Sequence, residues 1–325
     1  MEDTEGKNNE QLMHEKEEEG FCSKKKIALF IIVCFIFSIV LVILAIIVYL
    51  AKDYGLSPLE VYEKYDKIGN ITVGDSSVVY KAKNKNTSEI VSIKEIKLSK
   101  TKIRDEVKND ILFTQALHNY TKKSIEIKDI FEQRSTKFIV TEYYDEDLSV
   151  DLNNSKKGFD VDKIKNIMKQ INEILKVLRV KNIVHHNIKL ESILVQLNNS
   201  NNENEFEIKL GNFSQAKLLS NDKKKWENIK PYEDYDDKEY NKLVKQDLLD
   251  IGKEIYRMLF NEKNINKDNI NIDKIGDDNL VKLLEGLLEN DVEKRIKWED
   301  YFIHPFFNDD NETSSDYKNF IKNLK

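Results

Sequence analysis

The chain has 325 residues, of which 34% are charged and 40% hydrophobic, and its formal net charge is −6. This composition predicts a globular protein with room for one domain of about 250 residues. The lack of a basic excess excludes nucleic acid as a partner. The two cysteines, Cys22 and Cys34, lie in or beside one hydrophobic segment. The globular part therefore has no cysteine for a disulfide framework or a zinc site, while S-acylation and a plain structural role are both open for Cys22.

A hydrophobic segment at residues 27–51 follows a polar tail at residues 1–26. It contains no charged side chain and is long enough as a helix to cross a bilayer, so it predicts a single-pass integral membrane protein with a transmembrane helix. A cleaved signal peptide is the alternative, but the preceding tail is too long and too acidic for one. Lysines at residues 24–26 favour a cytoplasmic N-terminus and a lumenal or extracellular domain. The absence of cysteine from the domain keeps the opposite orientation open.

Residues 52–61 form a polar linker that contains Gly55 and Pro58, both of which interrupt regular structure. Beyond the linker, Val-, Ile- and Tyr-rich stretches predict strands, and apolar side chains at helical spacing predict helices that pack on a core. The predicted strands lie at residues 77–82, 90–97 and 138–143, and the predicted helices at 102–117 and 162–180. Strands followed by helices indicate an α+β fold.

Two stretches in the first half of the domain resemble motifs of the eukaryotic protein kinase superfamily. The stretch ITVGDSSVV matches the Gly-x-Gly-x-x-Gly-x-Val loop, with Gly74 as the middle glycine, Val79 as the valine and hydroxyl residues in place of the outer glycines. The stretch VSIK matches the Val-Ala-Ile-Lys strand. The resemblance implies that Lys94 would contact the phosphates of ATP, and that its carboxylate partner is Asp110.

A third stretch, IVHHNIKLESIL, resembles the kinase catalytic loop position for position. His185 is retained as a packing residue, and so is Lys189, which contacts the transferred phosphate in active kinases. His186 replaces the arginine that binds a regulatory phosphate, so that switch is not expected. Asn187 replaces the catalytic aspartate, and Ser192 replaces the metal-binding asparagine. An amide can orient a substrate hydroxyl but cannot accept its proton, so general-base catalysis should be lost.

A fourth stretch, IKLGNFS, resembles the segment that ends in Asp-Phe-Gly. Asn212 stands where the magnesium-binding aspartate belongs, and Ser214 stands where the glycine belongs. Mg²⁺ prefers anionic oxygen, so Asn212 and Ser192 are poor replacements and Mg²⁺ binding is disfavoured. ATP is the candidate cofactor, and no metal site is expected.

The positions that support the fold, by contrast, are retained. The resemblance implies that Phe213 and His185 stack in the hydrophobic spine and that Asp247 supports the backbone of the catalytic loop. Glu142 and Tyr143 fall at the connection between the lobes, where backbone groups would hold an adenine. The cleft therefore retains only some of the residues that bind a nucleotide in kinases, and nucleotide binding stays open.

The resemblance implies a bilobal protein-kinase-like domain at residues 62–307, with a small β-rich N-lobe and a large helical C-lobe, and a tail at residues 308–325. It predicts a membrane-anchored, catalytically impaired pseudokinase that acts as a signalling scaffold or allosteric regulator. Its protein partner is unknown, and another kinase is the candidate. Two alternatives stay open. One is a divergent active serine/threonine-type protein kinase that binds ATP, and the other is a structural membrane protein with an occluded pocket.

Overall fold

The computed structural model describes residues 32–33, 35–46, 60–73, 77–197, 206–219, 237–262 and 275–307. The chain divides into two compact units, Met1–Leu59 and Glu60–Lys325. In the first unit the described residues are helical, and their apolar side chains are exposed.

The prediction of a transmembrane helix at residues 27–51 is wrong. Within the part of the chain that the structure describes, no helix is both long enough and apolar enough to cross a membrane. The uninterrupted described run there, residues 35–46, is helical, and at 1.5 Å per residue it measures about 18 Å, against about 30 Å for a hydrocarbon core. The remainder of 27–51 lies outside the described residues, as do the polar tail and the linker up to Leu59. The membrane anchor, the membrane partner and the lumenal or extracellular placement are withdrawn with it.

The second unit begins with the short helix α2 and an antiparallel sheet with strand order β1-β2-β3-β5-β4. Alternate side chains of the central strands, such as Tyr80, Ala82, Val91 and Ile93, are buried, which is the pattern of a sheet with one face on a core. The predicted strands and the first predicted helix are confirmed. The elements are α2 (Glu60–Lys64), β1 (Tyr65–Val73), β2 (Ser77–Asn84), β3 (Ile90–Lys97), α3 (Thr101–His118), β4 (Ile127–Gln133) and β5 (Thr136–Glu142).

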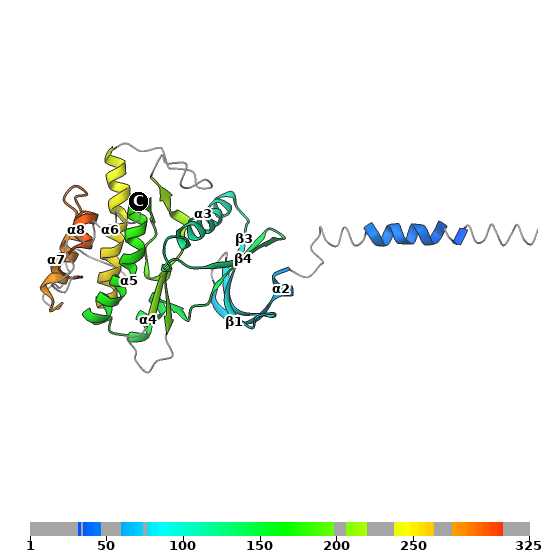
Figure 1. Cartoon of the computed structure of the whole chain (residues 1–325), viewed down its shortest axis with the longest axis horizontal. Helices are drawn as coiled ribbons and strands as arrows, with labels where there is room; N and C mark the ends of the chain where they lie inside the picture. The colour runs from blue at the N-terminus through cyan, green and yellow to red at the C-terminus, as the bar shows by residue number, and fades with distance from the viewer. Residues whose placement is uncertain are drawn as a thin grey trace, which may run out of the picture. The chain divides into compact units, whose positions relative to one another are not determined.

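The part that follows is mostly helical, and two small sheets, β6-β8-β9 and β10-β7, lie beside the helices. Figure 1 shows α5 and α6 side by side, with α7 and α8 on the outer side of α6. The elements are β6 (Glu146–Asp147), α4 (Leu148–Ser155), α5 (Val161–Val180), β7 (Ile183–Val184), the 3₁₀ helix η1 (Leu190–Ser192), β8 (Ile193–Leu197), β9 (Phe206–Leu210), the 3₁₀ helix η2 (Phe213–Gln215), β10 (Lys217–Leu218), α6 (Asp237–Phe260), α7 (Asp278–Leu287) and α8 (Trp298–Phe302).

The core of the helical part forms around α5. Its apolar stripe is buried together with leucines of α7 and the inner face of α6, which confirms the predicted helix and its packing face. The side chain of Asp160 caps the helix by accepting a hydrogen bond from the Lys163 amide at 2.7 Å. The packed helices α5, α6 and α7 support the loop between β7 and β8. A strand-rich first part and a helical second part are compatible with the predicted bilobal kinase-like fold.

Candidate functional site

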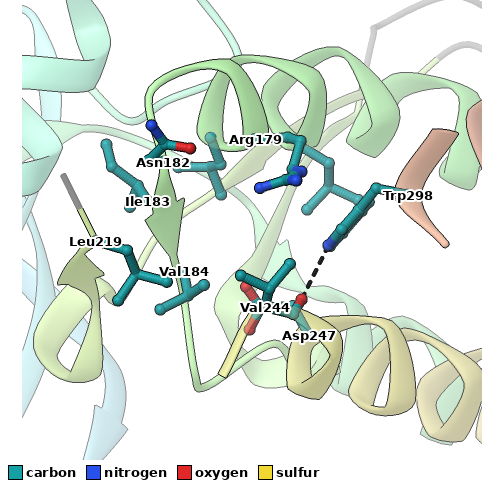
Figure 2. A pocket seen from close by; sticks show the side chains of 10 residues that line it. Arg179, Asn182, Ile183, Val184, Leu219, Val244, Asp247 and Trp298 are labelled. Atoms are coloured by element: carbon teal, nitrogen blue, oxygen red, sulfur yellow. Dashed lines mark hydrogen bonds between the residues drawn. The ribbon is translucent and has the colours of Figure 1, made fainter. Parts of the chain in front are cut away.

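Two cavities in the described part of the second unit differ greatly in size. The larger is a cleft of about 470 Å³ between the five-stranded sheet, α3 and the loop around η1. The smaller measures about 10 Å³ and lies between α5, β7 and the start of α6. Figure 2 shows Trp298 on its rim, where the indole Nε1 donates to the Val244 carbonyl at 2.9 Å. It has room for one water molecule, whereas the cleft has the size of a ligand site.

The back of the cleft holds an ion pair between β3 and α3. The Lys94 Nζ lies 3.6 Å from the Asp110 Oδ2, and the Asp110 Oδ1 accepts a hydrogen bond from the Phe213 amide at 2.7 Å. The short aspartate thus reaches both the strand lysine and the segment after β9. This arrangement brings together three residues that lie far apart in the sequence.

Asn109, which no sequence motif indicated as a site residue, strengthens the same junction. Its Nδ2 donates to the carbonyls of Phe213, Ser214 and Ala216 at 3.2, 3.0 and 2.9 Å. These bonds fix α3 directly to η2. The contact spans more than a hundred residues, so no local pattern could have indicated it.

His185 lies fully buried beneath the cleft. Its Nδ1 accepts a hydrogen bond from the Asn187 amide at 3.2 Å, and its Nε2 pairs with the Gly211 carbonyl at 3.1 Å. These two bonds require a neutral ring that carries its proton on Nε2. Burial accordingly lowers the pKa of His185 to about 4. The ring packs against Phe213 with 4.7 Å between centroids and an interplanar angle of 51°, so the two expected spine residues are in contact, but their rings are tilted rather than stacked.

Asp247 holds the backbone of the same loop. Its carboxylate accepts hydrogen bonds from the amides of His185 and His186 at 2.7 and 2.8 Å. His186 has a φ of 59°, a left-handed conformation that is unusual for a residue with a side chain. Burial raises the pKa of Asp247 to about 7, although the two amide bonds oppose that shift. The conformation of the loop is therefore held from below by α6.

The residues at the two metal positions use their polar groups within the protein. The Ser192 Oγ donates to the Asn187 carbonyl at 3.1 Å, and the Asn212 Oδ1 accepts from the Ser214 Oγ at 2.9 Å. Neither position offers an anionic oxygen. Among the residues that the structure describes, no group of three His, Cys, Asp or Glu side chains could hold a metal ion. Because Mg²⁺ needs hard anionic ligands in octahedral geometry, this donor set does not fit it.

The cleft gathers some of the predicted site residues and leaves out others. Those that line it are Val79, Lys94, Asp110, Lys189, Ser192 and Asn212. Asn187 is not part of the lining, and His185, Phe213 and Asp247 lie beneath it. Gly74 lies outside the described residues.

The connection between the lobes differs in detail from the expectation. Glu142 and Tyr143 are not part of the lining, whereas Tyr144 is. The Glu142 carboxylate contacts the Lys209 Nζ at 2.7 Å and accepts from the Glu126 amide at 2.8 Å, and the Tyr143 ring lies 4.1 Å from the Lys81 Nζ. Their predicted role in holding an adenine depends on backbone groups and stays a prediction.

Further lining residues could have been found from strand periodicity. Ser92 shares a face of β3 with Lys94, and Thr141 shares a face of β5 with Ile139, because side chains two apart in a strand point the same way. Apolar side chains, among them Ile111 and Ile125, also line the cleft. A Cβ added at Gly211 would lie 2.2 Å from the Ile125 Cδ1, so a glycine there keeps this part of the cleft open.

Comparison with known proteins agrees with this fold and cleft. The family model of the protein kinase domain matches residues 62–235, which is more than half of the chain. The chain therefore belongs to the protein kinase domain family. This confirms the predicted relationship to eukaryotic protein kinases, but it does not show that the member is degenerate.

Several curated kinases are similar to the chain. CTD kinase subunit alpha of Schizosaccharomyces pombe is 33% identical over 168 residues, which cover 51% of this chain and 26% of the relative. Cyclin-dependent kinase-like 1 of Caenorhabditis elegans is 27% identical over 160 residues, covering 49% and 43%. Cyclin-dependent kinase 12 of Drosophila melanogaster is 29% identical over 181 residues, covering 53% and 15%. The chain thus spans less than half of the length of each of these relatives. Their names support the alternative of a serine/threonine kinase better than the expectation of a pseudokinase.

Proposed function

We propose that the second unit binds an adenine nucleotide in the cleft and transfers its phosphate weakly or not at all. The observation that carries this proposal is a contrast within one cleft. The parts that hold a nucleotide and order the fold are assembled, as in the Lys94–Asp110 pair. The parts that would perform the chemistry are neutral, namely Asn187, Ser192 and Asn212.

The size of the expected defect follows from the chemistry of the missing groups. Removing one preorganised charged stabiliser from an active site typically lowers the rate by about a hundred- to a thousandfold. Asn187 cannot accept a proton from a substrate hydroxyl, and Asn212 cannot provide an anionic ligand to a metal. The two losses affect the same reaction centre and need not multiply, but both act against transfer.

A role that depends on protein contacts fits this cleft. Asn109 and Asp110 already hold α3 against η2, so the cleft is formed in the chain by itself. A preformed, weakly catalytic unit suits a scaffold or an allosteric regulator. The relatives are named as cyclin-dependent kinases, which supports a cyclin-like protein as the partner, alongside another kinase. We propose residues 62–307 as the extent of the domain, since Phe306 and Phe307 are still part of its core.

A divergent active serine/threonine protein kinase is the second candidate. The names of the relatives favour it, and so do the assembled Lys94–Asp110 pair and the retained Lys189 in the cleft lining. If this alternative holds, other groups of the protein must accept the substrate proton and bind the metal in place of the missing carboxylates.

Restoring the missing carboxylates separates the two candidates. The full chain and its Asn187→Asp/Asn212→Asp variant would be assayed for transfer of labelled phosphate from ATP to a generic protein substrate with Mg²⁺. The proposal expects the wild-type chain to remain at background and the variant to gain activity. Wild-type transfer equal to or above that of the variant would show that the native side chains are competent, and would contradict it.

A further inference from the structure

The lining of the cleft carries two lysines, Lys94 and Lys189, and it has the neutral side chains Ser192 and Asn212 where kinases place the asparagine and the aspartate that bind metal ions. We infer that this part of the cleft binds the phosphate groups of its ligand as a free anion, without a divalent cation. This inference rests on the proposed binding of a nucleotide. It starts from the finding that the donor set does not fit Mg²⁺.

Lys94 is available to a phosphate. Its pair with Asp110 is long, at 3.6 Å, and 36% of the Lys94 side chain is exposed. By comparison, the buried pair of Lys209 and Glu142 closes to 2.7 Å. The other oxygen of Asp110 is engaged by the Phe213 amide. A phosphate oxygen can therefore approach the Lys94 ammonium without breaking a tight ion pair.

Lys189 supplies a second positive charge to the lining. Within the described residues, its ammonium forms no salt bridge or hydrogen bond. The nearby Glu191 carboxylate is held instead by Arg257, at 2.9 Å from the guanidinium Nη2. Glu191 therefore competes only weakly for Lys189, and both lysines can take up charge from a ligand.

At the two metal positions, the groups that could bind a cation are neutral and already hydrogen-bonded within the protein. The amide oxygen of Asn212 accepts a hydrogen bond from the Ser214 hydroxyl, and the Ser192 hydroxyl donates one to the Asn187 carbonyl. The other carboxylates in the lining, Glu146 and Asp147, belong to β6, at the connection between the lobes. Of these, Asp147 accepts hydrogen bonds from the first turn of α4.

The consequence is an unusual order of affinities. A nucleotide complexed with Mg²⁺ carries less negative charge than the free nucleotide, so it gains less from Lys94 and Lys189. It finds no protein carboxylate at positions 187 or 212 to compensate through the metal. Active kinases have the opposite balance, because their carboxylates repel free phosphates and require the metal to bridge them.

Calorimetric titration of the full chain tests this order with three ligands: ATP in EDTA, ATP with Mg²⁺, and adenosine in both buffers. The expected result is that ATP binds about fivefold or more tightly in EDTA than with Mg²⁺, while adenosine binds equally in both. ATP binding that requires Mg²⁺, or equal ATP affinity in the two buffers, overturns the inference and leaves the proposed function standing. Absence of binding by all three ligands overturns the proposed function together with the inference.

The Asn212→Asp variant provides the mechanistic test, with Asn86→Asp as its matched control. The control introduces the same charge at an exposed turn outside the cleft lining. Asn212→Asp should weaken ATP binding in EDTA and make Mg²⁺ favourable, whereas the control should keep the wild-type order. Adenosine affinity should be unchanged in both variants, which shows that the cleft remains folded. An unchanged metal dependence in Asn212→Asp would overturn the inference.

Discussion

Glu142 and Lys209 form a buried ion pair that joins the end of β5 to β9, with 2.7 Å between the Lys209 Nζ and the Glu142 Oε1. Only 8% of the Lys209 side chain and 21% of the Glu142 side chain are exposed. The same carboxylate accepts a hydrogen bond from the Glu126 amide. Burial is the largest single influence on the pKa of Glu142 and would raise it, but the hydrogen bonds that the carboxylate accepts and the charge of Lys209 together outweigh burial, so the pKa lies below its usual value. The pair therefore fixes the connection between the strand-rich and helical parts.

Lys209→Met should lower the free energy of unfolding by about 3 kcal/mol, because it leaves a buried carboxylate without its partner. Urea unfolding followed by circular dichroism measures this. Glu142→Gln in the Lys209→Met background should recover part of the loss. Lys294→Met is the matched control, since its pair with Asp291 is exposed and should contribute less than about 1 kcal/mol. Equal effects of the two lysine variants would refute a structural role for the buried pair.

Asn109→Ala should loosen α3 from η2, because it removes the amide that donates to three carbonyls of that segment. The expected cost is about 1–3 kcal/mol, the price of unsatisfied buried carbonyls. Hydrogen exchange should speed up in α3 and in residues 213–216. Lys108→Ala, at the exposed neighbouring position, serves as the control and should leave exchange there unchanged. Similar exchange in both variants would mean that the apolar contacts of α3 hold the junction.

Gly211→Ala should weaken ligand binding, because the new methyl group would lie 2.2 Å from the Ile125 Cδ1 and displace that side chain. Adenosine and ATP should both lose affinity by about tenfold, which corresponds to one badly packed methyl group. Adding Ile125→Val should restore part of it by making room. Calorimetric titration measures the affinities of the single and double variants. Wild-type affinity in Gly211→Ala would show that the ligand does not occupy the part of the cleft beside Gly211.

The contribution of His185 to the stability of the unit should decrease in acid. Its pKa is about 4 in the folded state and 6.5 ordinarily, so the unfolded chain binds a proton between these values while the folded chain does not. Stability contributed by this residue is therefore lost as the pH falls from 6.5 to 4, by at most about 1.4 kcal/mol per pH unit.

Asp247 changes the pH dependence of stability in the opposite direction. Its folded pKa is raised to about 7 from 3.8, so its burial penalty is relieved as the pH falls through that range. The two residues largely cancel in the wild-type chain. The contribution of His185 appears as a difference between wild type and His185→Gln in chemical unfolding at several pH values. That difference should shrink between pH 6.5 and pH 4, and a constant difference would contradict the neutral, buried ring.

The sequence was sufficient to predict the roles of residues that belong to a local motif or to a regular apolar pattern. Lys94 and Asp110 were paired from the position of one motif and the helix that follows it, and the apolar spacing of α5 indicated its buried face. For residues 27–51 the composition predicted a membrane-spanning helix, whereas the described part of the chain contains no helix that is long and apolar enough to span a membrane. The Glu142–Lys209 pair joins residues 67 positions apart, so only the folded chain reveals it. The internal hydrogen bond of Asn212 likewise depends on a left-handed φ of 63° that no motif specifies.

The most direct test of a kinase fold with impaired chemistry is the transfer of labelled γ-phosphate from ATP by the full chain, measured beside Lys94→Ala with Mg²⁺ and with Mn²⁺. We expect the wild-type chain to incorporate no more phosphate into itself or an added substrate than Lys94→Ala does. Incorporation that clearly exceeds this background, and that is lost in Lys94→Ala, would contradict it and establish an active kinase.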